Sequence, residues 1–202
     1  MNKKWTRTAL TLIAAILLCS FVFPALADAD YDQALEYMKE KKYYSAYEAF
    51  RKSDESDADE KAQQCIQPWP KNGEVWRTSG GKGDPFEFTI VVNQSKDCGM
   101  LLRFMRKGFP ISSVFVGGTG TVKVSLPKGT YTIKAGIGEN WFGLEEYFGR
   151  NGSYETMTID GKEEIKLEGG YGYTLTINTS QRDPDADTVI SEYESWEEFI
   201  AK

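Results

Sequence analysis

An alternation of apolar and polar side chains recurs through residues 86–178 and constrains the fold more than any other feature. Phe88, Ile90 and Val92, for example, alternate with the polar residues Glu87, Thr89 and Asn93. A period of two is the side-chain spacing of a β-strand that buries one face. Turn signals rich in Gly, Pro and Asn separate the apolar runs. The pattern predicts about eight short strands, which we expect to form two packed antiparallel sheets.

Residues 31–66 follow a different period. Apolar residues recur there at spacings of three and four, with Lys and Glu between them, which is the pattern of amphipathic helices. The polar stretch 39–42 fits a tight connection between two antiparallel helices, and a third short helix is expected to end near Cys65. The residues that carry the pattern are Ala34, Leu35, Met38, Ala46, Ala49 and Phe50.

Together these patterns predict an α+β protein, in which a helical hairpin of two to three helices precedes an antiparallel β-sandwich and a short C-terminal helix. The expected parts are a signal peptide (1–27), the helical hairpin (28–66), a linker rich in Pro and Gly (67–85), the sandwich (86–180) and an acidic tail with the short helix (181–202).

Two motifs resemble known families. The run Tyr43-x-x-Ala46-x-x-x-Phe50 resembles a tetratricopeptide-type helical hairpin, although the Gly usual at the turn is Lys41 here. The run Leu126-Pro127-Lys128-Gly129-Thr130-Tyr131 resembles a hairpin of transthyretin-like and carboxypeptidase-regulatory-like sandwiches. The combination is similar to secreted bacterial proteins that pair such helices with a sandwich. The resemblance implies an accessory, adhesive or binding module and names no ligand.

The first 27 residues have the features of a signal peptide. Lys3, Lys4 and Arg7 precede an uncharged run over residues 9–23, and Ala25-Leu26-Ala27 supplies a cleavage pattern. We therefore expect cleavage after Ala27 and a secreted, extracellular or cell-surface product. An uncleaved anchor and a lipoprotein attached through Cys19 are the alternatives.

The charge balance excludes some partners and the missing histidine excludes some reactions. Cleavage would leave 24 − 3 = 21 Lys and Arg against 30 Asp and Glu, a net charge of −9. Such a chain is not expected to bind nucleic acid or, after signal cleavage, a membrane. The sequence contains no His, which excludes Ser-His-Asp and Cys-His nucleophile systems and metal sites that need imidazole.

The processed chain would keep two cysteines, Cys65 and Cys98. Because an exported protein meets oxidising conditions, the sequence predicts a Cys65–Cys98 disulfide. The alternative is that both thiols are buried and apart.

The densest aromatic patch lies in residues 139–149. Planar rings beside carboxylates suit a sugar or peptide, so the predicted ligand-binding surface is Trp141, Phe142, Tyr147 and Phe148. The alternative is that Trp141, Leu144 and Phe148 plug one end of the sandwich. Adjacent Glu145 and Glu146 do not fit a glycosidase pair, because its carboxyl groups must face each other across the substrate.

Residues 183–194 resemble an EF-hand calcium loop. Asp183, Asp185 and Asp187 occupy the first, third and fifth positions, and Glu194 occupies the twelfth. Ca²⁺ is thus the one cofactor for which the sequence offers a site. Thr188 stands where such loops need Gly, and a solvated acidic linker explains the same residues.

These features favour an exported, non-enzymatic binding or protein-interaction module whose partner is a protein or carbohydrate at the cell surface. The alternatives are a secreted hydrolase that uses Asp and Glu on a cell-wall or polysaccharide substrate, and a purely structural module of a surface assembly.

Overall fold

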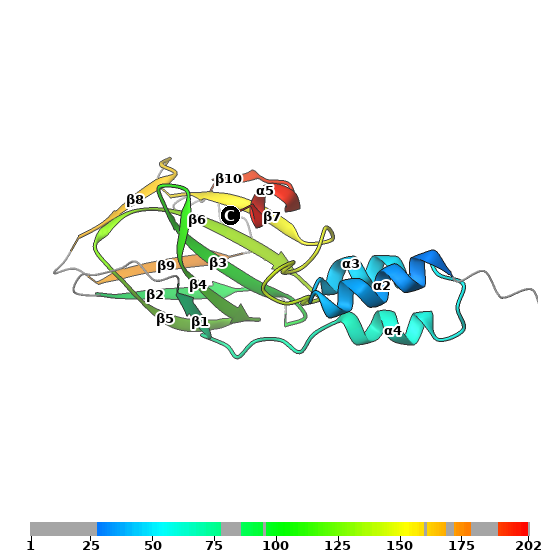
Figure 1. Ribbon diagram of the computed structural model, residues 1–202. Helices are drawn as coiled ribbons and strands as arrows, with labels where there is room; N and C mark the ends of the chain where they lie inside the picture. The colour runs from blue at the N-terminus through cyan, green and yellow to red at the C-terminus, as the bar shows by residue number, and fades with distance from the viewer. Residues whose placement is uncertain are drawn as a thin grey trace, which may run out of the picture.

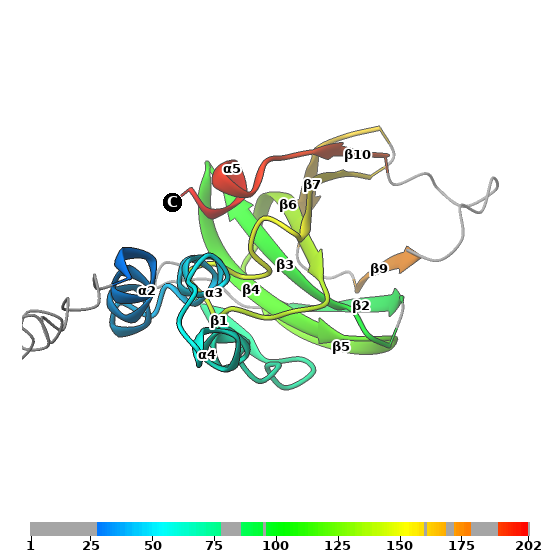
Figure 2. The same cartoon turned by 90° about the vertical axis from the view of Figure 1, so that its right-hand side faces the viewer.

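The computed structural model describes residues 28–77, 86–94, 96–159, 161–168, 172–178 and 190–201. The predicted signal peptide lies outside these residues. Three helices pack at one end of two β-sheets, and the C-terminal helix lies on the sheets near the same end (Figures 1 and 2). The predicted α+β class is confirmed. None of the helices in the described part is long and apolar enough to cross a membrane.

The helical part consists of α2 (Ala29–Lys39), α3 (Tyr43–Phe50) and α4 (Ala58–Cys65). Asp28 caps α2 by accepting hydrogen bonds from the backbone N–H groups of Asp30 and Tyr31. Small buried side chains line the contacts between the helices, so the backbones approach closely around Phe50. The buried residues of this cluster are Ala34, Ala46, Ala49, Phe50, Ala62 and Cys65. The predicted hairpin and third helix are confirmed.

The larger sheet has the strand order β1-β4-β3-β6-β7-β10, and β8 pairs with β6 beside β7. Every pair in this sheet is antiparallel. Its strands are β1 (Val75–Arg77), β3 (Gly99–Arg106), β4 (Phe109–Gly117), β6 (Gly129–Gly138), β7 (Ser153–Thr158), β8 (Glu164–Leu167) and β10 (Ile190–Tyr193). Strand β1 falls within the stretch that the sequence predicts as a linker.

The smaller sheet has the order β5-β2-β9. Its strands are β2 (Phe86–Asn93), β5 (Gly120–Leu126) and β9 (Tyr173–Asn178). Strands β2 and β5 are antiparallel, whereas β2 and β9 are parallel. This parallel pair departs from the predicted antiparallel arrangement, because strand alternation indicates burial but not the direction of the neighbouring strand.

One core joins the inner faces of the two sheets. Ile90 and Val92 from the smaller sheet pack with Met100, Leu102 and Phe104 from the larger one. The intervening residues of β3 point to the outer face of the larger sheet, because successive side chains of a strand alternate. Leu101 and Arg103 are nevertheless buried, so this outer face is also covered.

The cover includes α5 (Trp196–Ile200), which begins with a capping box formed by Ser195 and Glu198. Phe199 of α5 is fully buried and lies close to Gly136 of β6, where an added Cβ would be 3.1 Å from the Phe199 ring. The predicted C-terminal helix is thus confirmed, and it packs on the outer face of the larger sheet.

The turn between α2 and α3 predicts a stabilising substitution. Lys41 has φ 60°, a left-handed conformation that costs non-glycine residues about 1 kcal/mol. We expect Lys41→Gly to raise the free energy of unfolding by up to about 1 kcal/mol, measured by urea denaturation. The neighbouring Lys42 has φ −86°, so the control Lys42→Gly gains no such relief and is expected to destabilise. Equal effects of the two substitutions would contradict this explanation.

Candidate functional site

The aromatic residues predicted to form a ligand-binding surface are largely buried. Trp141, Phe142 and Phe148 are each at most 4% exposed, and Tyr147 is only partly exposed. The predicted exposed surface is therefore wrong for Trp141, Phe142 and Phe148, whereas ligand contact by Tyr147 stays a prediction. Of the residues predicted to form a plug instead, Trp141 and Phe148 are buried as expected, whereas Leu144 is 44% exposed.

Trp141 packs on the outer face of the larger sheet. Its ring meets Phe115 of β4 edge-on, with centroids 5.6 Å apart, and meets Phe148 at 5.3 Å. The N–H of Gln67, just after α4, donates a 2.8 Å hydrogen bond to the carbonyl of Trp141. Residues 139–149 therefore form a structural layer between the sheet and the helices, and the rings of Trp141 and Phe148 are buried within the protein.

Phe142 faces the opposite way, toward the helices. Its ring lies 5.1 Å from that of Tyr44 and 5.5 Å from that of Tyr47, both in α3. Tyr44 in turn meets Trp196 of α5 edge-on at 5.4 Å. This aromatic chain joins the helices, the 139–149 layer and α5 into one body.

Glu146 holds the same junction by hydrogen bonds. Helix α3 lacks a side-chain cap of its own, since Lys42 at the N-cap makes no such bond. The buried carboxylate of Glu146 accepts hydrogen bonds from the N–H of Tyr44 at 2.6 Å, and from the N–H and hydroxyl of Ser45. It thereby caps a helix that is about a hundred residues away in the sequence.

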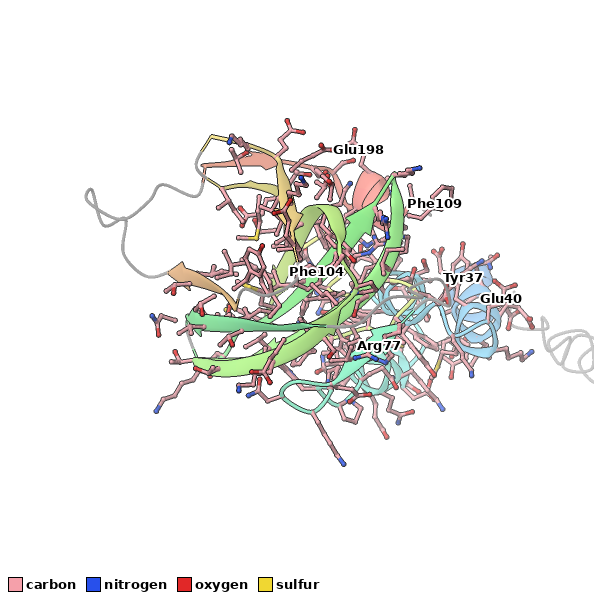
Figure 3. The ribbon with its side chains drawn as sticks, turned by 90° about the vertical axis from the view of Figure 1, so that its left-hand side faces the viewer. Tyr37, Glu40, Arg77, Phe104, Phe109 and Glu198 are labelled. Atoms are coloured by element: carbon pink, nitrogen blue, oxygen red, sulfur yellow. The ribbon has the colours of Figure 1, made fainter. Side chains whose placement is uncertain are left out.

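A groove opens beside this junction, between the exposed side of α2 and α3 and the start of α5. Its volume is about 340 Å³, within the usual range of ligand sites. Two carboxylates (Asp30 and Glu48) and two cations (Lys52 and Arg150) line it together with aromatic rings. The other lining residues are Gln33, Tyr37, Tyr44, Ser45, Ala49 and Trp196. Figure 3 shows Tyr37 among the side chains of the helical end.

Arg150 forms one wall of the groove. Its guanidinium lies 5.5 Å from the centre of the Trp196 ring and pairs with Glu197 at 2.7 Å. The indole N–H of Trp196 donates to the carbonyl of Glu146, which fixes the ring against the junction. The groove thus has an aromatic wall that is held in place, and it contains two carboxylates, Asp30 and Glu48, that take part in none of the salt bridges recorded for the described residues. Its lining contains as many cations as carboxylates.

This groove could not be recognised from the sequence. Tyr37, Tyr44 and Trp196 each fit an amphipathic helix without marking a site, and the three lie in different helices. Only the packing of α5 against α3 brings the walls together.

The calcium-like loop is only partly described. Asp183, Asp185 and Asp187 lie outside the described residues. The carboxylate of Glu194 pairs with Lys134 of β6 at 2.8 Å and accepts a hydrogen bond from the Thr156 hydroxyl of β7. These bonds anchor the chain between β10 and α5 to the larger sheet. Calcium binding at these residues stays a prediction.

The two cysteines are free in the structure, so the predicted Cys65–Cys98 disulfide is not formed. Cys65 is buried in the helical cluster and donates to the carbonyl of Lys61 in its own helix. Cys98 belongs to the connection before β3, where its carbonyl accepts from Gly118. The sequence rule on paired thiols gives no information on whether two positions face each other, and here the Cys65 thiol bonds within its own helix.

The burial of Cys65 predicts slow alkylation. Desolvation, followed by the negative charge of Glu146, raises the pKa of the Cys65 thiol to about 11, so the thiol stays protonated at pH 8. We expect iodoacetamide to modify the half-buried Cys98 first and Cys65 only after denaturation, as followed by intact mass. Rapid labelling of both native thiols would contradict the described burial, and labelling of neither after denaturation would indicate a disulfide.

Removal of the Glu146 carboxylate should undock the helices. Glu146→Ala leaves buried N–H groups of α3 without an acceptor, so we expect a loss of about 2–3 kcal/mol in the free energy of unfolding. Glu146→Gln keeps one acceptor oxygen and should lose about 1 kcal/mol. Exposed Glu139 provides the control, and Glu139→Ala should change stability by less than about 0.5 kcal/mol. Equal denaturation midpoints for all three variants would refute the capping role.

Comparison with models of known protein families finds no match for this chain, and comparison with curated proteins finds no relative. The tetratricopeptide-like and transthyretin-like resemblances therefore stay predictions.

Proposed function

We propose that the protein is an exported, non-enzymatic binding module, and that its ligand occupies the groove between α2, α3 and α5. The observation that carries the proposal is the lining of that groove. A groove of about 340 Å³ combines aromatic rings with polar side chains from α2, α3 and α5, and hydrogen bonds to Glu146 fix the last two of these helices in position. Rings supply contact area and polar groups orient a ligand.

The lining favours a neutral, polar ligand. Two carboxylates face two cations, so the groove has no net charge with which to select an ionic partner. Carboxylates, an amide and a hydroxyl offer both donors and acceptors to hydroxyl groups. A cell-surface oligosaccharide has this chemistry, with an apolar ring face and many hydroxyls, and it is the ligand class that we propose.

Titration calorimetry with soluble chito-oligosaccharides and peptidoglycan fragments tests the proposal. We expect Glu48→Gln and Gln33→Ala to weaken binding by about fivefold to tenfold each, because each removes one hydrogen-bonding partner. Glu60→Gln on α4 is the matched control, since Glu60 is exposed and does not line the groove. Binding that is unchanged in both groove variants would place the ligand elsewhere.

A hydrolase is the alternative, and one observation favours it. Asp30 and Glu48 lie in the same groove, as an acid and a base or nucleophile would have to. Release of reducing ends from the same oligosaccharides, abolished by Asp30→Asn or Glu48→Gln, would support hydrolysis over simple binding. Absence of release from an oligosaccharide that binds would favour the non-enzymatic module.

A further inference from the structure

The charges of this protein are unevenly distributed over the fold. Residues 28–66, which form the helices, contain 11 Asp and Glu against 6 Lys and Arg. Residues 99–138, which form β3 to β6, contain six Lys and Arg and no Asp or Glu. The net negative charge therefore does not describe the surface that strands β3 to β6 present.

Three of these six cations are buried or already paired with a carboxylate. Arg103 is buried, Lys123 pairs with Glu87 at 2.7 Å, and Lys134 pairs with Glu194. The remaining three, Arg106, Lys107 and Lys128, take part in none of the salt bridges recorded for the described residues. They are the charges available to a partner.

These three cations converge at one tip of the sheets. Arg106 and Lys107 belong to the β3–β4 turn, and Lys128 belongs to the β5–β6 turn. The guanidinium of Arg106 lies over the second turn, since a Cβ added to Gly129 would be 3.1 Å from its central carbon. Lys166 lies near Lys128 but pairs with Glu168. Figure 1 shows both turns at the end of the sheets away from the helices.

The same tip carries the most exposed large apolar side chain of the described residues. Phe109 is 66% exposed and is the cross-strand partner of Arg106. Figure 3 shows its side chain at the periphery of the molecule. The basic tip is therefore Arg106, Lys107, Phe109 and Lys128, an aromatic ring surrounded by cations on a protruding turn.

We infer that the basic tip docks on an anionic lipid surface. Cations close to such a surface are attracted to its headgroups, and an exposed ring beside them can enter the interface. An exposed ring beside cations suits an interface that offers both anionic headgroups and an apolar layer, a combination that the face of an acidic protein offers less readily. This site is distinct from the groove beside α3, so neither depends on the other.

The acidic helices do not oppose this contact. An eight-residue strand such as β3 spans about 26 Å, and β3 separates the tip from the helical end. Charges in water are screened over about 8 Å at physiological ionic strength. The carboxylates of the helices are therefore too far away to cancel the cations of the tip, and Glu168, which lines the same hollow as Lys128, is paired with Lys166. A membrane contact at the tip departs from the expectation, based on net charge, of none.

Vesicle co-sedimentation tests this inference. The protein beginning at Asp28 is used, because the apolar run 9–23 would itself insert, and the probes are phosphatidylcholine vesicles with and without phosphatidylglycerol. We expect binding only to the vesicles that contain phosphatidylglycerol, with weaker binding as salt is raised. Equal binding to both vesicles, or binding to neither, would overturn the inference.

Variants locate the contact. Lys107→Gln and Lys128→Gln should each weaken vesicle binding by about fivefold, and Phe109→Ser by about tenfold. Lys71→Gln is the matched control, because Lys71 is exposed, precedes β1 and lies outside the tip, yet the net charge changes equally. An equal loss in Lys71→Gln would show a general charge effect and overturn the site. Loss in the lysine variants but not in Phe109→Ser would show that the ring does not enter the interface and would overturn the inferred docking of the whole tip.

Discussion

The hydrogen bonds of Glu146 are the constraint on which the rest of this structure depends. The carboxylate caps α3, and the backbone carbonyl of the same residue accepts from the indole N–H of Trp196. One residue thus connects the helices, the layer over the sheet and the C-terminal helix. The helices need this connection, because their own core is small and consists mainly of alanines around Phe50. A single hairpin without neighbouring repeats buries too little apolar surface to be stable alone.

Buried charge at the outer face of the larger sheet is satisfied mainly by backbone groups and rings. Arg103 is 2% exposed, and its guanidinium donates to the carbonyl of Phe199 near the end of α5. Its guanidinium also lies 5.2 Å from the Phe199 ring and 5.5 Å from the Tyr147 ring. Glu146 and Arg103 therefore act in parallel. The carboxylate accepts hydrogen bonds from N–H groups that begin one helix, and the guanidinium donates a hydrogen bond to a carbonyl near the end of another.

The sequence predicted the elements better than their contacts. Strands and helices follow from local periods of two and of three to four, so the period of Phe88, Ile90 and Val92 was sufficient for β2. The role of Glu146 could not be predicted, because Glu145 beside it has the same side chain and the bond to Tyr44 joins residues that are 102 positions apart. Trp141 was misassigned for a related reason. An aromatic cluster looks the same whether its rings meet a ligand or another part of the protein, and only the docked helices decide between the two.

The net charge likewise does not show where the charged residues lie on the protein. A chain with an excess of carboxylates is expected to repel anionic surfaces as a whole, and this holds only if the charges are mixed on the scale of the screening length. Here 11 of the 30 carboxylates lie in residues 28–66 and 15 lie in residues 139–202, whereas residues 99–138, which form β3 to β6, contain none. Because β3 pairs antiparallel with β6, the end of β3 lies beside the start of β6, so the cations of the β3–β4 and β5–β6 turns are neighbours although about twenty residues separate them. Topology, rather than composition, therefore determines which charge a partner meets at this end of the molecule.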